Sequence, residues 1–233
     1  MRLSRRGLIL GGAALLGACA TTARQESLTL SQVSPIELPP VNTGLQPITP
    51  AVAPVPKTVM DPQGLIRKDL LEAGLKSLDL HGARIPNRDA IYLVDFDRHS
   101  SKPRLFRLNL QSGAVDSFRT AHGRGSDPMH TGFAQMFSNV PESYTSSLGA
   151  YVTAGMSSGA VHSENVLLDG LDYSNSLARE RAIIVHGADY CEPSYLQAFG
   201  KLGRSNGCFS VSNEDLAVLR PAMASGRLIF AAH

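Results

Sequence analysis

Two residue types that can act as a thiol nucleophile and its base lie in one region of the sequence. His186 follows a short apolar run at residues 183–185, and Cys208 ends a Gly-rich segment. A cysteine reacts as its thiolate, and the ordinary thiol pKa of ~8.5 means that a base or a positive charge must stabilise that form. The pair therefore predicts nucleophilic catalysis in which folding brings the cysteine and the histidine together.

The residues around Cys208 extend this prediction. Gly207 leaves no side chain beside the sulfur, so a carbonyl group can approach and backbone N–H groups can form an oxyanion hole. Arg204 and Lys201 lie just upstream and can supply positive charge. We expect oxyanion and substrate contacts from five residues near the nucleophile and the base: Arg204, Ser205, Asn206, Gly207 and Gly187.

Each of these residues also has an ordinary structural interpretation. Cysteine is among the most commonly buried residue types, and a histidine that ends a buried strand is often part of the core. Cys191 and Cys208 can also form a disulfide in an oxidising compartment, which would remove the nucleophile.

A zinc site is a further alternative, but the spacing of the candidate ligands matches no short metal motif. These ligands are His122, His130, His162, His186 and Cys208.

The N-terminus is typical of an export signal. Residues 1–6 are basic, residues 8–16 form an apolar run too short to span a bilayer, and Ser4-Arg5-Arg6 resembles the start of a twin-arginine signal. Residues 16–19 resemble a lipobox, in which Cys19 is lipidated, although ordinary cleavage after Ala20 is an alternative. We expect a signal peptide at residues 1–20 and an exported, lipid-anchored periplasmic protein.

Composition and patterning divide the remaining chain into a linker and one domain. Residues 21–59 are rich in Pro and Thr, which predicts a disordered linker, and residues 60–233 are long enough for one folded domain. The net charge of +2 gives no reason to expect a nucleic-acid partner, and we expect a monomer.

The folded region has a β-rich pattern between two helices. Asp61-Pro62 and the leucine spacing that follows predict a leading helix up to His81, and Ser212 with Asp215 predicts a capped helix that ends near Pro221. Strands are expected at residues 90–96, 104–110, 115–120, 132–133, 151–153, 165–168, 182–185 and 227–230.

Taken together, the motifs resemble the L,D-transpeptidase catalytic domain (the YkuD-like family), and most closely its divergent murein L,D-transpeptidase branch. The resemblance is carried by residues 185–190 (Val-His-Gly-Ala-Asp-Tyr) and residues 203–208 (Gly-Arg-Ser-Asn-Gly-Cys). Further matching segments lie at residues 137–139, 146–151, 168–171 and 181–183. The similarity extends from about Met60 to the C-terminus.

The resemblance implies a mainly β, L,D-transpeptidase-like catalytic domain without a metal or organic cofactor. Cys208 would attack the third residue of a peptidoglycan stem peptide, and His186 would take the thiol proton. An amine from a second stem would give a cross-link, whereas water would give an L,D-carboxypeptidase. Candidate cleft residues are His122, Arg124, Tyr144 and Ser147.

The sequence departs from the familiar form of the family at the nucleophile. Asn206 stands where a histidine is usual, and Phe209-Ser210-Val211 lacks the arginine that usually follows the cysteine. Substrate contacts made by those side chains must come from elsewhere, for example from Arg204 or Arg124. Two other hypotheses stay open here: a non-catalytic wall-binding lipoprotein with a Cys191–Cys208 disulfide, and a zinc hydrolase.

Overall fold

The computed structural model describes residues 58–158, 164–223 and 225–233. The expected signal peptide, the lipidation site Cys19 and all of the expected linker except residues 58 and 59 lie outside the described residues. Within the described part of the chain, no helix is both long enough and apolar enough to cross a bilayer.

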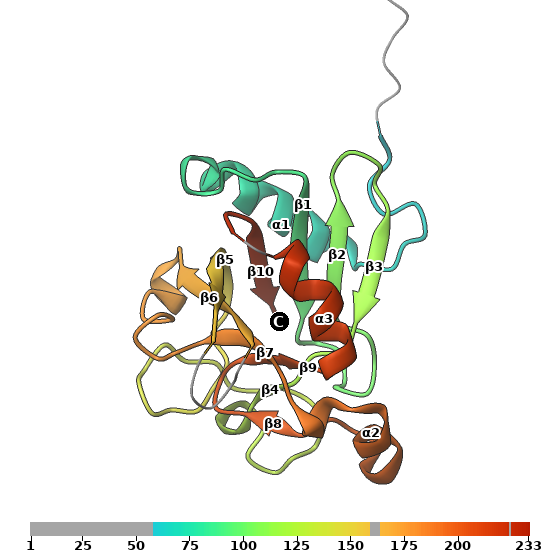
Figure 1. The fold of residues 1–233 in the computed structure, drawn as a ribbon, viewed down its shortest axis with the longest axis vertical. Coiled ribbons are helices and arrows are strands. Elements are labelled where there is room, and N and C mark those ends of the chain that lie inside the picture. Colours follow the sequence, from blue (N-terminus) through green and yellow to red (C-terminus); the bar gives the residue numbers. More distant parts are fainter. Residues whose placement is uncertain (1–57, 159–163, 224) are drawn as a thin grey trace, which may run out of the picture. The chain divides into compact units, whose positions relative to one another are not determined.

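The described chain folds around a mixed sheet of eight strands in the order β3-β2-β1-β10-β5-β6-β7-β9 (Figure 1). Two neighbouring pairs, β1 with β10 and β7 with β9, are parallel, and the other pairs are antiparallel. The fold is therefore mainly β, as the sequence predicted. The strands are β1 (Ala90–Asp95), β2 (Leu105–Asn109), β3 (Val115–Phe118), β5 (Gly149–Ser157), β6 (Asn165–Gly170), β7 (Ile184–Gly187), β9 (Phe209–Val211) and β10 (Leu228–Ala232).

A second, two-stranded sheet lies beside the nucleophile region. Strand β4 (His122–Gly123) pairs in parallel with β8 (Arg204–Ser205), so that His122 lies opposite Arg204. Among the described residues, four short 3-10 helices lie in the connections: η1 (Gly82–Arg84), η2 (Arg124–Ser126), η3 (Tyr173–Asn175) and η4 (Asp189–Cys191).

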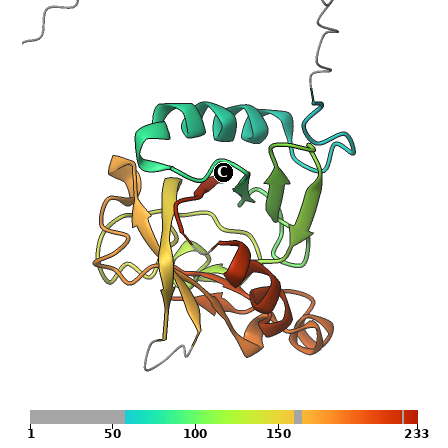
Figure 2. The same cartoon turned by 45° about the horizontal axis from the view of Figure 1, so that its top comes forward.

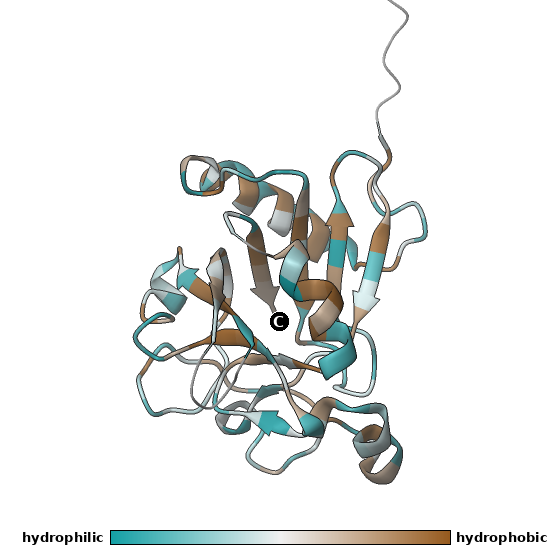
Figure 3. Ribbon diagram, in the orientation of Figure 1, coloured by the Kyte–Doolittle hydropathy of each residue, from teal (hydrophilic) through white to brown (hydrophobic). Residues whose placement is uncertain are grey.

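Apolar side chains cover both faces of the large sheet at β1. Every residue of this strand is therefore buried. Tyr92 and Val94 of β1 face the cluster that includes Leu219 of α3 (Asn213–Ala222), while Leu93 belongs to the cluster that includes Leu70. Leu70 lies on α1 (Lys68–Leu80), which Figure 2 shows across the top of the sheet. Figure 3 shows apolar residues along these strands and hydrophilic residues in the loops. Burial of apolar surface on both faces therefore holds the sheet between the two helices.

Both expected helices are present, although the first begins later than predicted. Asp61 does not cap α1. It has a φ of 51°, and its carboxylate instead accepts hydrogen bonds from Leu65 N (3.0 Å) and Ile66 N (2.8 Å). Gly64, with a φ of 64°, interrupts any helix between Asp61 and Lys68. In α3 the Ser212 hydroxyl accepts from Asp215 N at 3.1 Å, as expected of an N-cap.

One predicted strand is absent, and several elements, including the short strands β4, β8 and β9, were not predicted. The strand expected at residues 132–133 is a loop, because Gly132 has a φ of 94° and its N–H donates to the Asp127 carboxylate at 2.7 Å. In addition, residues 193–199 form a helix, α2 (Pro193–Phe199), that the sequence analysis did not predict. Proline at its first position and Gly200 in a left-handed conformation after its end are the signals that could have identified it.

Candidate active site

The parallel pairing of β7 and β9 brings His186, on β7, near Cys208, which directly precedes β9. His186 is paired with Ser210, and Val185 with Phe209. Cys208 immediately precedes β9, and a backbone hydrogen bond from Ile184 of β7 reaches its thiol. Residues far apart in the sequence are therefore placed in one region by the register of two short strands.

Both ring nitrogens of His186 take part in hydrogen bonds. Nδ1 lies 2.8 Å from the carbonyl oxygen of Gly187, and Nε2 lies 2.9 Å from the hydroxyl oxygen of Ser210. The same Ser210 oxygen lies 2.9 Å from the hydroxyl of Tyr190 in η4. The imidazole is almost completely buried, and these contacts fix its orientation.

The environment of the Cys208 thiol contains opposing influences. Burial raises its pKa, whereas hydrogen bonds from the backbone N–H groups of Ile184 and Cys208 and the charge of Arg181 lower it. The thiol itself donates to the carbonyl of Ala182 at 3.5 Å. Burial dominates, so the pKa is raised overall, and a base is needed to generate the thiolate at neutral pH.

Cys191 is a free cysteine that is buried in the protein interior. Its thiol donates to the carbonyl of Ser210 at 3.4 Å, and burial raises its pKa to about 12. Cys208 is also free. The Cys191–Cys208 disulfide considered above is therefore not present in the structure, and Cys208 retains its thiol.

Arg181 supplies the positive charge near Cys208, a role that the sequence analysis assigned to other residues. Its guanidinium donates to the Ser138 carbonyl (2.8 Å) and the Ser147 hydroxyl (3.1 Å) through Nη1. Nη2 donates to the Thr145 carbonyl (2.6 Å) and the Ser143 hydroxyl (3.4 Å). The side chain thus joins the loop of residues 138–147 to the nucleophile. Its position directly before the apolar run of β7 was the available signal.

A compact turn holds the nucleophile. Gly207 has a φ of 121°, and a Cβ atom there would lie 2.7 Å from the carbonyl oxygen of Thr145, so only glycine fits without strain. Ser205 Oγ accepts from Gly207 N (3.0 Å) and donates to the carbonyl of Cys208 (2.8 Å). The Gly207 N–H is therefore already used inside the turn, which leaves the N–H groups of Cys208 and Ile184 as those that face the thiol.

Several of the expected substrate residues instead stabilise the surrounding structure. The Arg204 guanidinium donates to the carbonyls of Asp127 and Pro128, the latter at 3.1 Å. His122 is buried between Arg104, which lies 2.8 Å from Nδ1, and Asp127, which lies 3.3 Å from Nε2. Burial and the neighbouring Arg104 lower the pKa of His122 to about 3. Neither side chain is placed in an open cleft.

A polar pocket of about 380 Å³ lies next to the nucleophile turn. Asn206, two positions from the nucleophile, forms part of its wall together with Arg181 and Tyr144. The guanidinium of Arg124 stacks on the ring of Tyr144, 3.9 Å from its centroid. Ser147 is buried behind the wall, where it accepts from Tyr151 at 2.9 Å. The remaining wall residues are Pro141, Glu142 and Glu180.

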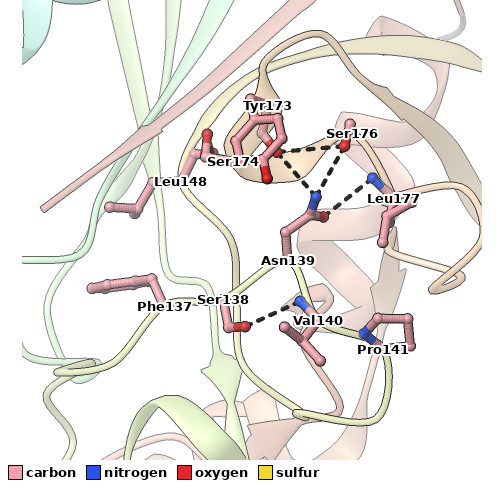
Figure 4. Close-up of a pocket in the computed structure, with 10 residues that line it drawn as sticks. All are labelled: Phe137, Ser138, Asn139, Val140, Pro141, Leu148, Tyr173, Ser174, Ser176 and Leu177. Atoms are coloured by element: carbon pink, nitrogen blue, oxygen red, sulfur yellow. Dashed lines mark hydrogen bonds between the residues drawn. The ribbon is translucent and has the colours of Figure 1, made fainter.

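A larger, mostly apolar pocket of about 780 Å³ (Figure 4) shares the lining residue Pro141 with the polar pocket. Its rim is fixed by Asn139, whose side chain bonds to Tyr173 O, Ser176 Oγ and Leu177 N at 3.0 to 3.1 Å. Figure 4 shows Phe137 and Leu148 along one side and the residues of the η3 segment along the other.

The zinc alternative has no assembled ligand set in the part of the chain that the structure describes. There, no three His, Cys, Asp or Glu side chains lie together as metal ligands do. His122 and His186 belong to the separate networks described above. His130 Nε2 lies 2.9 Å from the carbonyl oxygen of Leu202. His162 lies outside the described residues.

Comparison with known proteins identifies a family. Residues 63–232 match the sequence profile of the L,D-transpeptidase catalytic domain. No curated protein sequence matches the chain.

Solved structures with a similar fold include an L,D-transpeptidase from Mycobacterium smegmatis (12% identity, TM-score 0.38, 62% of this chain and 59% of the other). L,D-transpeptidase 1 from Mycobacterium tuberculosis is also similar, with 13% identity and a TM-score of 0.36 over 62% of this chain and 62% of the other. The chain thus spans about three fifths of the length of these proteins. At such low scores, the family assignment rests on the profile match.

Proposed function

We propose that this chain, which belongs to the L,D-transpeptidase catalytic domain family, is a cysteine acyltransferase that acts on peptidoglycan stem peptides. The observation that carries the proposal is the placement of His186 on β7 and of Cys208 directly before the neighbouring strand β9, with both ring nitrogens of the histidine held by hydrogen bonds. A nucleophile beside an oriented base is the arrangement that covalent acyl transfer requires.

In the proposed reaction, Cys208 Sγ forms a bond to the carbonyl carbon of the third stem residue while His186 takes the thiol proton. The bond to the terminal D-amino acid then breaks, and its amine leaves with that proton. An amine of a second stem attacks the thioester to form a cross-link and releases the thiol. Water in place of the amine gives the L,D-carboxypeptidase outcome.

Three local features support this sequence of steps. The N–H groups of Cys208 and Ile184 face the thiol, so they are placed to stabilise the negative charge of the thiolate nucleophile. Arg181 lowers the thiol pKa against the effect of burial. The polar pocket beside Asn206 offers space for the polar groups of a stem peptide next to the nucleophile.

The proposal also includes the setting in which the enzyme works. We infer an exported, monomeric protein that is anchored in a bacterial membrane through lipid on Cys19 and reaches peptidoglycan through the Pro-rich segment. The basic start, the short apolar run and the cysteine that follows it support this inference.

Intact mass spectrometry after exposure to a carbapenem, a mimic of the acyl donor, tests the proposal. We expect one adduct on Cys208, no adduct in Cys208→Ala, and slower formation in His186→Ala. Wild-type protein with a free Cys208 thiol and no adduct would contradict it. The half-buried Cys208 tolerates loss of its sulfur without a large cavity, so near-UV circular dichroism of Cys208→Ala serves as the folding control.

A further inference from the structure

We propose that Tyr190 and Ser210 are positioning residues for the base, and that their hydroxyl groups fix the tautomer of His186 and then accommodate the proton that it receives. This inference rests on the proposed acyl transfer, because it concerns how the base of that reaction is prepared. It is carried by a continuous series of hydrogen bonds from Tyr190 through Ser210 to His186, which we term the hydroxyl relay.

The direction of each hydrogen bond in the relay follows from one carbonyl group. Gly187 O can only accept, so Nδ1 of His186 must carry the proton at this 2.8 Å contact. In the neutral ring Nε2 is then unprotonated, and the Ser210 hydroxyl must donate to it at 2.9 Å. Because Ser210 has a single proton, its oxygen accepts from the Tyr190 hydroxyl, also at 2.9 Å. The neutral base is thereby held with Nε2 as its basic nitrogen. Because this nitrogen has a single lone pair, it can take a proton once the Ser210 hydroxyl has turned away from it.

Protonation of His186 reverses the relay without moving any heavy atom. Nε2 then donates to Ser210 Oγ, and the proton of Ser210 needs a new acceptor. Ser210 is completely buried, so water does not readily provide one. The Tyr190 oxygen lies within reach, and its own proton can turn to solvent because Tyr190 is only partly buried. Without Tyr190, a buried donor is left unsatisfied in the protonated state, at a cost of about 1–3 kcal/mol.

The position of Tyr190 is defined by its backbone and its neighbours. Its carbonyl accepts from Gly203 N at 2.8 Å, and a Cβ atom on Gly203 would lie 2.5 Å from that of Tyr190. The aromatic ring therefore packs against a glycine on the segment that leads to the nucleophile. Burial raises the pKa of Tyr190 to about 12, so the phenol keeps its proton throughout the working pH range.

Other titratable groups among the described residues lie around the hydroxyl relay and act on other atoms. Cys191 lies on the backbone side of Ser210, where its thiol donates to the carbonyl, and Arg181 acts on Cys208 from the turn before β7. Glu192 and Asp215 lie further out and raise the pKa of Cys191. Within the part of the chain that the structure describes, the hydroxyls of Tyr190 and Ser210 form a hydrogen-bonded series that leads to Nε2.

The test compares Tyr190→Phe with Tyr195→Phe, which removes the same hydroxyl from helix α2, where the ring packs against Phe199. Alkylation of Cys208 by iodoacetamide in the full chain is measured from pH 5 to 10 by peptide mass spectrometry. In Tyr190→Phe we expect a roughly tenfold slower reaction at neutral pH and a higher midpoint, because protonation of His186, which accompanies formation of the thiolate, is disfavoured. Ser210→Ala should show the same changes, and Tyr195→Phe should match wild type.

Equal midpoints and rates in Tyr190→Phe and Tyr195→Phe would overturn the proposal. A second measurement needs no variant: the ¹⁵N chemical shifts of the His186 ring above its pKa should show protonated Nδ1 and unprotonated Nε2, and the opposite tautomer would also overturn it. Iodoacetamide and the tautomer require no cell-wall substrate. A wild-type protein that forms no carbapenem adduct but shows the expected profile would therefore reject the acyl transfer and retain the relay.

Discussion

The Nη2 atom of Arg181 lies 2.6 Å from the carbonyl oxygen of Thr145, and the same oxygen would lie 2.7 Å from a Cβ atom on Gly207. The Thr145 carbonyl group thus lies between the Arg181 guanidinium, which acts on the Cys208 thiol, and the turn that carries Cys208. The loop wall of the polar pocket and the nucleophile turn are consequently positioned against each other, and a change at either residue should alter both.

Replacement of Arg181 should slow the reaction of Cys208. Arg181→Lys retains a positive charge but cannot form the same set of four hydrogen bonds, because a lysine ammonium lacks the planar donor fork. The positive charge of Arg181 lowers the pKa of the Cys208 thiol, and Arg181→Ala removes this charge. The midpoint of the alkylation profile should therefore rise in Arg181→Ala, and it should rise less in Arg181→Lys. We expect a rate at pH 7 about tenfold lower in Arg181→Ala.

Arg179→Ala provides the matched control for Arg181→Ala. Arg179 lies two positions earlier in the same segment, and its guanidinium bonds to the exposed Asp169 at 2.8 Å. An exposed pair of this kind contributes little to stability, so the control should keep the wild-type profile. If Arg181→Ala retains the wild-type midpoint, the charge of Arg181 does not act on the thiol.

Gly207→Ala should damage both stability and activity. The residue needs a φ of 121° and close contact with the Thr145 carbonyl, so a methyl group adds backbone strain and a steric clash. We expect a loss of about 2–3 kcal/mol in the free energy of unfolding, measured by urea denaturation, together with loss of carbapenem acylation.

Gly200→Ala separates the backbone strain of a positive φ from the steric clash with a neighbouring group. Gly200 also has a positive φ, 69°, but no atom lies within 4 Å of the position that its Cβ would occupy. Only the conformational cost remains there, about 1 kcal/mol, and acylation should persist. Equal losses in the two variants would show that crowding at Thr145 is not important for the nucleophile turn.

The fold and the reacting pair were predictable because each has a local signal. The alternating pattern of Phe106 and Leu108 marked β2, the Ser212 cap marked α3, and the types and setting of His186 and Cys208 indicated their chemistry. The register of β7 and β9 was not predictable, since it depends on pairing between segments that are distant in the sequence. For this reason the partners of His186, Ser210 and Tyr190, could be identified only in the structure.

The roles of the charged residues were also not predictable from the sequence, because they depend on tertiary contacts. Arg204 and His122 stand in suggestive sequence positions, yet their polar atoms are used to hold the loop at Asp127. Arg181 begins one of the segments that match the family, but the sequence did not indicate its role, and in the structure it donates hydrogen bonds to four groups around the site. Whether a charged side chain is free or already bonded is decided by tertiary contacts, which a pattern of residue types does not contain.

The two cysteines of the catalytic domain should differ sharply in reactivity. Burial raises the pKa of Cys191 to about 12 and encloses its sulfur, whereas Cys208 is only partly buried and adjoins Arg181. Brief treatment of the native protein with iodoacetamide at pH 8 should label Cys208 and leave Cys191 unmodified, as read by peptide mass spectrometry. In urea both should react at similar rates. Rapid native labelling of Cys191 would contradict the buried environment seen here.

The buried His122 should make stability depend on pH. Its pKa is about 3 in the folded protein and about 6.5 in an unfolded chain, so the unfolded state binds one more proton between these values. Stability from this group is complete above pH 6.5 and declines as the pH falls towards 3, by about 1.4 kcal/mol per pH unit. In His122→Gln this contribution is absent, so the variant, although less stable at pH 7, should lose stability more slowly on acidification. Urea unfolding of both proteins between pH 7 and pH 4 measures the difference, and parallel curves would show that His122 does not remain neutral in the fold.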